Sequence, residues 1–475
     1  MKQLSGMDAS FLYFETADTP NHIGSFAIYD QSTAPDGQVR FKAILANLER
    51  RLHLARCFRQ KLVKVPLDLD HPYWIEDPDF DLEFHVRHIA LPRPGDWRQL
   101  CIQAARLHSR PLDLGRPLWE LYVIEGLDNV EGVPAGAFAV LTKIHHAAID
   151  GVTGAEILGA IHDTEPEGKP APPEEPWKPE REPTLLELSA RTTLNNVRNP
   201  FRMAQVLSRN APGLLNLVRP TPELEDESAP EEVPRTRFNG TVSGHRVIDA
   251  RSYSLQDIRD IRKRVPGATV NDVVLAVCSG ALRRYLDHHG ERPEASLKAM
   301  APISVRADDE EGDAGNRVSS MTVTLHSDEP DPLERLDKIQ FSTKASKAMN
   351  KAIGARTMTD VTQFVPGALA GLAARLFTGL GLANSVSPIA NTVITNVPGP
   401  QIPLYFTGAR MVGFYGMGPV MDAMGLIHPV FSWSGRISIS FTSCREMMPD
   451  PGFYAECLDA SFTELREAAR APEAS

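Results

Sequence analysis

Two adjacent histidines stand in the stretch whose chemistry is most suggestive. In KIHHAAIDGVTG (143–154), His145 and His146 are followed by Asp150, four residues after the second histidine, and by Gly151. A histidine side chain has a reference pKa of about 6.5, which suits the removal of a proton near neutral pH. The sequence has no GxSxG turn that would present an activated serine. These residues therefore favour direct transfer, in which a histidine deprotonates an acceptor hydroxyl or amine.

Two other interpretations compete with a general base. A metal site would need a third ligand at a suitable spacing, but HHxxxD is not a zincin pattern and no second cluster of histidines or cysteines accompanies it. In a purely structural role, both imidazoles would hydrogen-bond to buried carbonyls. The combination of paired histidines, Asp150 and Gly151 at one strand end favours chemistry over either alternative.

The segment before the histidines predicts how they are positioned. GAFAVLTKI (136–144) has the composition of a strand, and VTGAEILGAIHD (152–163) has helical spacing. Side chains that are neighbours along a strand point to opposite faces. Only one of the two histidines is therefore expected to reach a site, while the other packs behind it. Strand-to-helix junctions of this kind often carry catalytic groups.

Strand and helix signals alternate along both halves of the chain. The predicted strands cover residues 22–29, 82–91, 118–127, 136–144, 297–306, 319–326, 390–397 and 435–443, and the predicted helices cover 41–55, 96–109, 271–289 and 453–470. A chain of 475 residues is too long for one core. We expect an N-terminal domain (1–164), a linker (165–236) and a C-terminal domain (237–475), all of the α/β class, with a cleft between the two domains.

The linker prediction rests on two stretches rich in proline and acidic residues, 165–183 and 220–235. Between them lies 185–219, whose second half carries several arginines among apolar residues. Such a basic amphipathic segment fits a membrane surface, and it equally fits a helix that packs over the domain junction.

Composition excludes some classes of protein. The net charge of −11 argues against a nucleic-acid binder. Five scattered cysteines indicate neither a zinc site nor a disulfide framework, and the N-terminus lacks the apolar region of a signal peptide, so a cytoplasmic location is expected. The stretch 364–386 is apolar but rich in small residues and interrupted by Pro366, which favours a buried or interfacial helix pair over a membrane span.

Several motifs together resemble one known family. HHAAIDG (145–151) is similar to the HHxxxDG signature of acyl-CoA-dependent acyltransferases and condensation domains. The chain also resembles the bacterial wax ester synthase/diacylglycerol acyltransferase family in its PLW motif (117–119), its ND motif (271–272), its NVPGP motif (396–400), GNR (315–317) and the opening SGMDASF (5–11). The resemblance spans about residues 4–465, with the motifs in the family's order.

The resemblance implies a fold and a reaction. It implies two chloramphenicol-acetyltransferase-like α/β domains with mixed sheets and an active-site tunnel at their interface. His146 would take the proton from a fatty alcohol or from the free hydroxyl of a diacylglycerol, and the oxygen would attack the thioester of a long-chain acyl-CoA. Acyl-CoA would be a substrate, with no cofactor and no metal. The enzyme would contact a membrane or lipid inclusion peripherally.

The resemblance also implies roles for further residues. Asp150 would be structural and pair with an arginine, for which Arg306 is the candidate, and Gly151 would permit a special backbone conformation. His145 would support the turn. Asn271 would contact the base or the oxyanion, and it is also a natural N-cap.

The substrate-binding candidates come from the PLW and NVPGP motifs: Pro117, Trp119, Asn396, Pro398 and Gly399. Core packing is the alternative for the PLW motif. NVPGP would shape a tunnel wall or the crossover between domains. The stretches 364–389 and 406–421 are candidates to line an apolar tunnel, and both would also suit an ordinary core.

Two rival functions remain open. One is a condensation-type enzyme that uses carrier-bound thioesters, although no carrier or adenylation domain adjoins. The other is a lipid-binding protein without catalysis, against which the intact HHAAIDG speaks.

Overall fold

The computed structural model describes residues 1–149, 154–168, 170, 172, 177–195, 197, 232–304, 318–353, 384–385 and 387–471. Five features singled out from the sequence lie outside these residues: Asp150 with Gly151, the candidate partner Arg306, the GNR motif (315–317), the basic residues 198–219, and most of 364–389. Among the described residues, no helix combines the length and the apolar character that crossing a bilayer requires.

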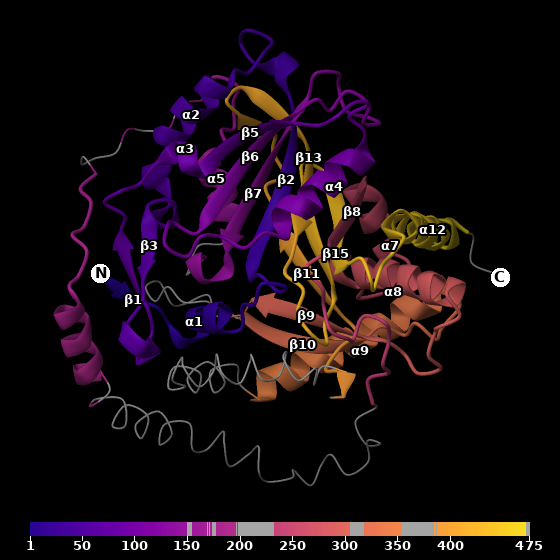
Figure 1. Ribbon diagram of the computed structural model, residues 1–475. Coiled ribbons are helices and arrows are strands. Elements are labelled where there is room, and N and C mark those ends of the chain that lie inside the picture. Colours follow the sequence, from indigo (N-terminus) through magenta and orange to yellow (C-terminus); the bar gives the residue numbers. More distant parts are fainter. Residues whose placement is uncertain are drawn as a thin grey trace.

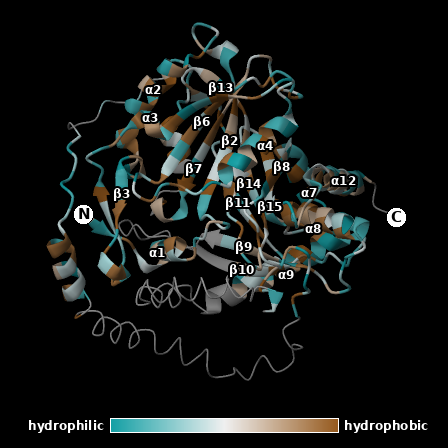
Figure 2. Ribbon diagram, in the orientation of Figure 1, coloured by the Kyte–Doolittle hydropathy of each residue, from teal (hydrophilic) through white to brown (hydrophobic). Residues whose placement is uncertain are grey.

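The first large sheet has six strands in the order β12-β13-β2-β7-β6-β5. Its members are β12 (Tyr405–Phe406), β13 (Ala409–Met417), β2 (His22–Asp30), β7 (Phe138–His145), β6 (Trp119–Glu125) and β5 (Val86–Ala90). β5 and β6 are parallel and the other neighbours are antiparallel, so the sheet is mixed. Its central strands appear largely hydrophobic in Figure 2 because helices and loops cover both faces.

The second large sheet has the order β10-β9-β11-β14-β15-β8. Its strands are β8 (Arg246–Ser254), β9 (Lys298–Ser304), β10 (Val318–Thr324), β11 (Thr392–Pro398), β14 (Leu426–Trp433) and β15 (Arg436–Cys444). β11 is parallel to both of its neighbours, and the remaining pairs are antiparallel. A small antiparallel sheet, β1-β4-β3, comprises β1 (Lys2–Gln3), β3 (Gln60–Val63) and β4 (Tyr73–Glu76).

The helices are divided between the two halves. The first half carries α1 (Gly6–Tyr13), α2 (Phe41–Glu49), α3 (Leu82–His85), α4 (Trp97–His108) and α5 (Gly154–Ile161). The second carries α7 (Leu255–Arg262), α8 (Val270–His288), α9 (Pro332–Ile353) and α12 (Pro451–Arg470). Figure 1 shows α7, α8 and α12 gathered beside the second sheet, where their apolar side chains join one core.

Most predicted elements are confirmed. The strands expected at 22–29, 118–127, 136–144, 390–397 and 435–443 are β2, β6, β7, β11 and β15. The strand expected at 82–91 is wrong in its first half, because 82–85 form the helical turn α3. There the Asp81 carboxylate accepts the Glu83 amide as an N-cap, and the strand begins only at Val86.

One segment from the second half of the chain belongs to the first sheet. β12 and β13, which lie far inside the predicted C-terminal domain, complete the first sheet, where β13 pairs antiparallel with β2. Figure 1 shows β13, coloured for its late position in the sequence, beside β2 from the N-terminus. Residues 405–417, which follow the predicted boundary at 237 in sequence, thus give the open edge of β2 the hydrogen-bonding partner that its backbone needs.

Part of the predicted linker packs on the first half. Leu188 is buried with Val65 and Tyr73. The Asn195 amide donates to the Asp70 carboxylate (2.9 Å) and to the hydroxyl of Tyr73 (3.1 Å). Residues 185–195 thus form a helix docked on the small sheet rather than an unattached tether.

Candidate active site

The two histidines lie where β7 ends. His145 is the last residue of the strand, paired in register with His22, and His146 begins a short 3₁₀ turn, His146–Ala148. The backbone amide of His146 donates to the Asn21 carbonyl (2.9 Å), which carries the pairing between the two segments past the end of the strand. The predicted strand-to-helix junction is confirmed, with the 3₁₀ turn directly after β7 and α5 beginning at Gly154. The two histidine rings contact different partners.

His145 is fully buried and holds the turn together. Its Nδ1 accepts the backbone amide of Ala147 (3.1 Å), so Nε2 carries the ring proton in the neutral form. Nε2 then donates to the carboxylate of Glu15 at 3.3 Å. Both ring nitrogens are therefore occupied, which leaves no lone pair on His145 for a substrate.

His146 lies against the ring of Phe11. The two rings are stacked, with centroids 3.8 Å apart and planes 17° from parallel. The pKa of His146 is lowered to about 4, mainly by burial and also by the neighbouring His145, while the backbone carbonyl of His146 acts in the opposite direction. The imidazole is therefore neutral across the neutral pH range, as a proton acceptor must be.

Nδ1 of His146 is buried and has no hydrogen-bonding partner among the described residues. In a neutral imidazole one nitrogen carries the proton and the other keeps a lone pair, so the ring can accept a proton from a substrate.

The N-terminal segment builds the surroundings of both histidines. Ser5 caps α1 by accepting the amide of Asp8, and α1 presents Phe11 to His146. The side-chain amide of Asn21 donates to the Phe11 carbonyl (2.9 Å), and the backbone carbonyl of Asn21 accepts the backbone amide of His146. Sequence reasoning missed Glu15 and Asn21. The only signal for this region was the opening SGMDASF motif, which ends at Phe11.

Asn271 and Asn396, from two motifs 125 residues apart, come together. The side-chain amide nitrogen of Asn396 on β11 lies 3.5 Å from Oδ1 of Asn271 on α8. Asn271 is not the N-cap: Thr269 caps α8, and Asp272 completes a reciprocal capping box with it. Asn271 is thus free of a capping role. Among the described residues, no hydrogen bond joins either asparagine to His146.

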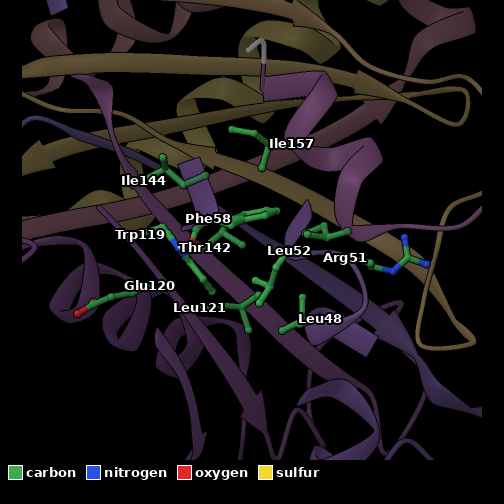
Figure 3. A pocket seen from close by; sticks show the side chains of 11 residues that line it. Leu48, Arg51, Leu52, Phe58, Trp119, Glu120, Leu121, Thr142, Ile144 and Ile157 are labelled. Carbon is green, nitrogen blue, oxygen red and sulfur yellow. Dashed lines mark hydrogen bonds between the residues drawn. The ribbon is translucent and has the colours of Figure 1, made fainter. Parts of the chain in front are cut away.

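Trp119 lines an apolar cavity behind the histidine strand (Figure 3). Its indole nitrogen donates to the Phe58 carbonyl (3.0 Å), and its ring stacks on His85 with centroids 4.6 Å apart. Pro117, which precedes the strand, is buried. Both candidates from the PLW motif therefore lie in the core of the first half, and Trp119 also borders empty space.

Pro398 and Gly399 mark the end of β11. The Gly399 amide donates to the Ser432 carbonyl (2.8 Å), and a Cβ on this glycine would lie 2.6 Å from that oxygen. Glycine is required here because two backbones approach closely. Pro398 pairs with Ser432 of β14. The position of both residues is therefore explained by the end of the strand.

Neither metal ligation nor disulfide chemistry is supported in the described part of the chain. No group of three or more His, Cys, Asp or Glu side chains there is arranged to hold a metal ion. All five cysteines are buried free thiols.

Comparisons with known proteins agree on one family. A sequence model described as the wax ester synthase/diacylglycerol acyltransferase catalytic domain matches residues 4–274, and the C-terminal domain of the same family matches 314–466. A putative diacylglycerol O-acyltransferase from Mycobacterium tuberculosis (strain CDC 1551 / Oshkosh) is 34% identical over 467 residues, which are 98% of this chain and 90% of the relative.

Solved structures resemble the whole chain. The wax ester synthase/diacylglycerol acyltransferase from Marinobacter aquaeolei VT8 superposes with a TM-score of 0.70 at 28% identity, covering 99% of this chain and all of that one. A starter condensation domain of rhizomide synthetase, at 14% identity and a TM-score of 0.53, covers 99% of this chain and 94% of its own and shares the fold. The predicted α/β fold with mixed sheets is confirmed.

Proposed function

Because the chain belongs to the wax ester synthase/diacylglycerol acyltransferase family, it is an acyl-CoA-dependent acyltransferase, and we propose that it esterifies a fatty alcohol or a diacylglycerol with His146 as the general base. The observation that supports the assignment of the base is the neutral His146 imidazole, which is stacked on Phe11 and whose Nδ1 has no hydrogen-bonding partner among the described residues.

The proposed reaction proceeds by direct transfer. Nε2 of His146 takes the proton of the acceptor hydroxyl as its oxygen attacks the thioester carbon of acyl-CoA. The C–S bond then breaks, the ester forms, and the proton passes from the imidazolium to the departing CoA thiolate. A positioned base contributes about 10²–10⁴-fold in rate. The reactants themselves supply every bond that changes, so the proposal invokes no cofactor.

A pKa of about 4 makes His146 a weak base that stays unprotonated at neutral pH. The thioester is an activated acyl donor, and the alcohol needs to lose its proton only as the C–O bond forms. Positioning of the two substrates then carries much of the remaining acceleration. Asn271 and Asn396, which lie together on the second half, are the proposed polar contacts for the reacting groups.

The decisive experiment compares the native chain with His146→Ala. Purified protein is supplied with palmitoyl-CoA and either hexadecanol or a diacylglycerol, and the ester products are identified by mass spectrometry. We expect ester from the native chain and a loss of about 10²–10⁴-fold in the variant, with ligand affinity largely retained. Equal product from both proteins would exclude His146 as the base.

We further propose that the protein contacts a lipid surface peripherally, because both acceptor classes are insoluble in water. The described helical residues 185–195 and 197 support this contact. Leu186, Leu194 and Val197 expose 82%, 49% and 61% of their surface. They recur with helical spacing on the side away from buried Leu188.

A further inference from the structure

The first half contains a cavity of about 20 Å³, which has room for one water-sized group (Figure 3). It lies between the first sheet and the helices α2 and α5. Its lining is mainly apolar and comprises Leu48, Leu52, Phe58, Trp119, Leu121, Ile144, Ile157 and Ile161, with Arg51, Glu120 and Thr142 at its border.

The polar groups at the border already have partners. Arg51 is bound by Asn47, by the carbonyls of Ala160 and His162, and by the Asp163 carboxylate. The Thr142 hydroxyl pairs with that of Ser25 (3.0 Å). The Glu120 carboxylate accepts from the Tyr122 hydroxyl (2.8 Å) and from the Lys143 ammonium (3.3 Å).

The hydrogen bonds already made by the polar side chains at the border determine which kind of group the cavity can hold. A water molecule needs two to four hydrogen-bonding partners, and the polar side chains at this border are already engaged with other groups, so an apolar occupant is favoured. A methyl or methylene group loses nothing there and fills space that otherwise lacks contacts.

The cavity lies along the strand that carries the histidines. Ile144 and Thr142 precede His146 on β7 by two and four residues, which corresponds to roughly 7 and 13 Å along a strand. Ile157 comes from α5, the helix that follows the histidine motif. The cavity thus lies beside β7, within the length of a long alkyl chain whose reacting end is at His146.

We propose that this cavity receives the methyl end of a substrate's alkyl chain and so sets the preferred chain length of the transferase. The inference rests on the proposed function. Trp119 is a fixed wall of the pocket, because its indole is hydrogen-bonded to Phe58 and stacked on His85. Ile157 is the adjustable wall, because its side chain can be shortened or enlarged without breaking a polar contact.

The test is a two-way series at Ile157, assayed with acyl-CoA donors and alcohol acceptors of 10 to 20 carbons. Each buried methylene contributes about 0.8 kcal/mol, or about fourfold in a binding constant. Ile157→Ala is therefore expected to move the optimum of kcat/KM to longer chains, with about a tenfold gain for two added carbons relative to the native optimum. Ile157→Phe is expected to shorten it.

Leu158→Ala is the matched control. Leu158 is adjacent on α5 and equally buried (9% against 7% exposed) but does not line the cavity, so its chain-length profile is expected to match the native one. Thermal melts identify any variant that fails to fold, and the opposite substitution at Ile157 then decides. Ester formation with unshifted profiles in the Ile157 variants would overturn this inference alone. No ester from the native chain at any length would instead refute the proposed function.

Discussion

At the scale of single residues, the two histidines differ in their contacts. His145 uses both ring nitrogens, one for the Ala147 amide and one for Glu15. Nδ1 of His146 has no partner among the described residues, and the ring owes its low pKa mainly to burial, to which the stacked Phe11 ring contributes. Phe11 should therefore tune the base as well as orient it.

Replacement of Phe11 by Ala tests this role through the pH profile. Loss of the ring admits water to His146, so its pKa should rise from about 4 toward the ordinary 6.5. Because only the neutral imidazole accepts a proton, the acid limb of kcat/KM should move upward by about two pH units.

Phe14→Ala is the control for the Phe11 variant. Phe14 lies three residues further on and is 54% exposed, and its removal should leave the acid limb unchanged. A Phe11→Ala variant that is slower at every pH but has an unshifted limb would show that the ring only supports packing.

At the scale of elements, two glycines differ in the space that a side chain would find at their positions. Gly399 ends β11 where a side chain would collide with the Ser432 carbonyl at 2.6 Å, a backbone atom that cannot rotate away. Gly159 lies exposed on α5 with nothing within 4 Å of a built Cβ. The same substitution should therefore have opposite effects on stability at these two positions.

Gly399→Ala is expected to lower the free energy of unfolding by about 1–3 kcal/mol, because β11 must shift away from β14. Gly159→Ala should raise it by about 0.5–1 kcal/mol, because alanine has less conformational freedom to lose in a helix. Thermal and denaturant unfolding of both variants check this. A destabilised Gly159→Ala, or a neutral Gly399→Ala, would contradict the packing described here.

At the scale of the whole molecule, the two halves are joined by more than a chain connection. β13 completes the first sheet, the Trp97 indole donates to Asp249 on β8 (2.8 Å), and the His108 imidazole contacts the Gly418 carbonyl (3.1 Å). On the outside, the helix at 185–195 docks one side on the small sheet and leaves leucines exposed on another.

The exposed leucines predict where lipid binds. Replacement of Leu186 and Leu194 by Asp should reduce co-sedimentation with vesicles of phosphatidylcholine and phosphatidylglycerol, because charge cannot enter the apolar part of the interface. Ser189→Asp with Thr193→Asp adds the same charge to the same helix at exposed polar positions and should retain more binding. Equal vesicle binding by both double variants would argue against this surface. Turnover of a short-chain alcohol should be unaffected in either.

The sequence by itself determined the local features of this protein. Strand-like composition between turn residues predicted β2, β6, β7 and β11, and a helical pattern predicted α8, because both signals lie in residues close together in the chain. The motifs identified His146 and the family, since both are written in short runs of residues. The capping of α8 was misassigned by two residues, because Thr269 and Asn271 are both suitable caps and only the backbone distinguishes them.

Only the tertiary structure decided which residues surround the histidines. Glu15, Asn21 and Phe11 lie more than a hundred residues before His146, and their contacts with the histidine turn depend on how α1 and β2 pack against β7. The sequence also did not show that β13 belongs to the first sheet. A strand's pattern shows which face is buried but not which open edge will complete its backbone hydrogen bonds, and that choice depends on the whole chain.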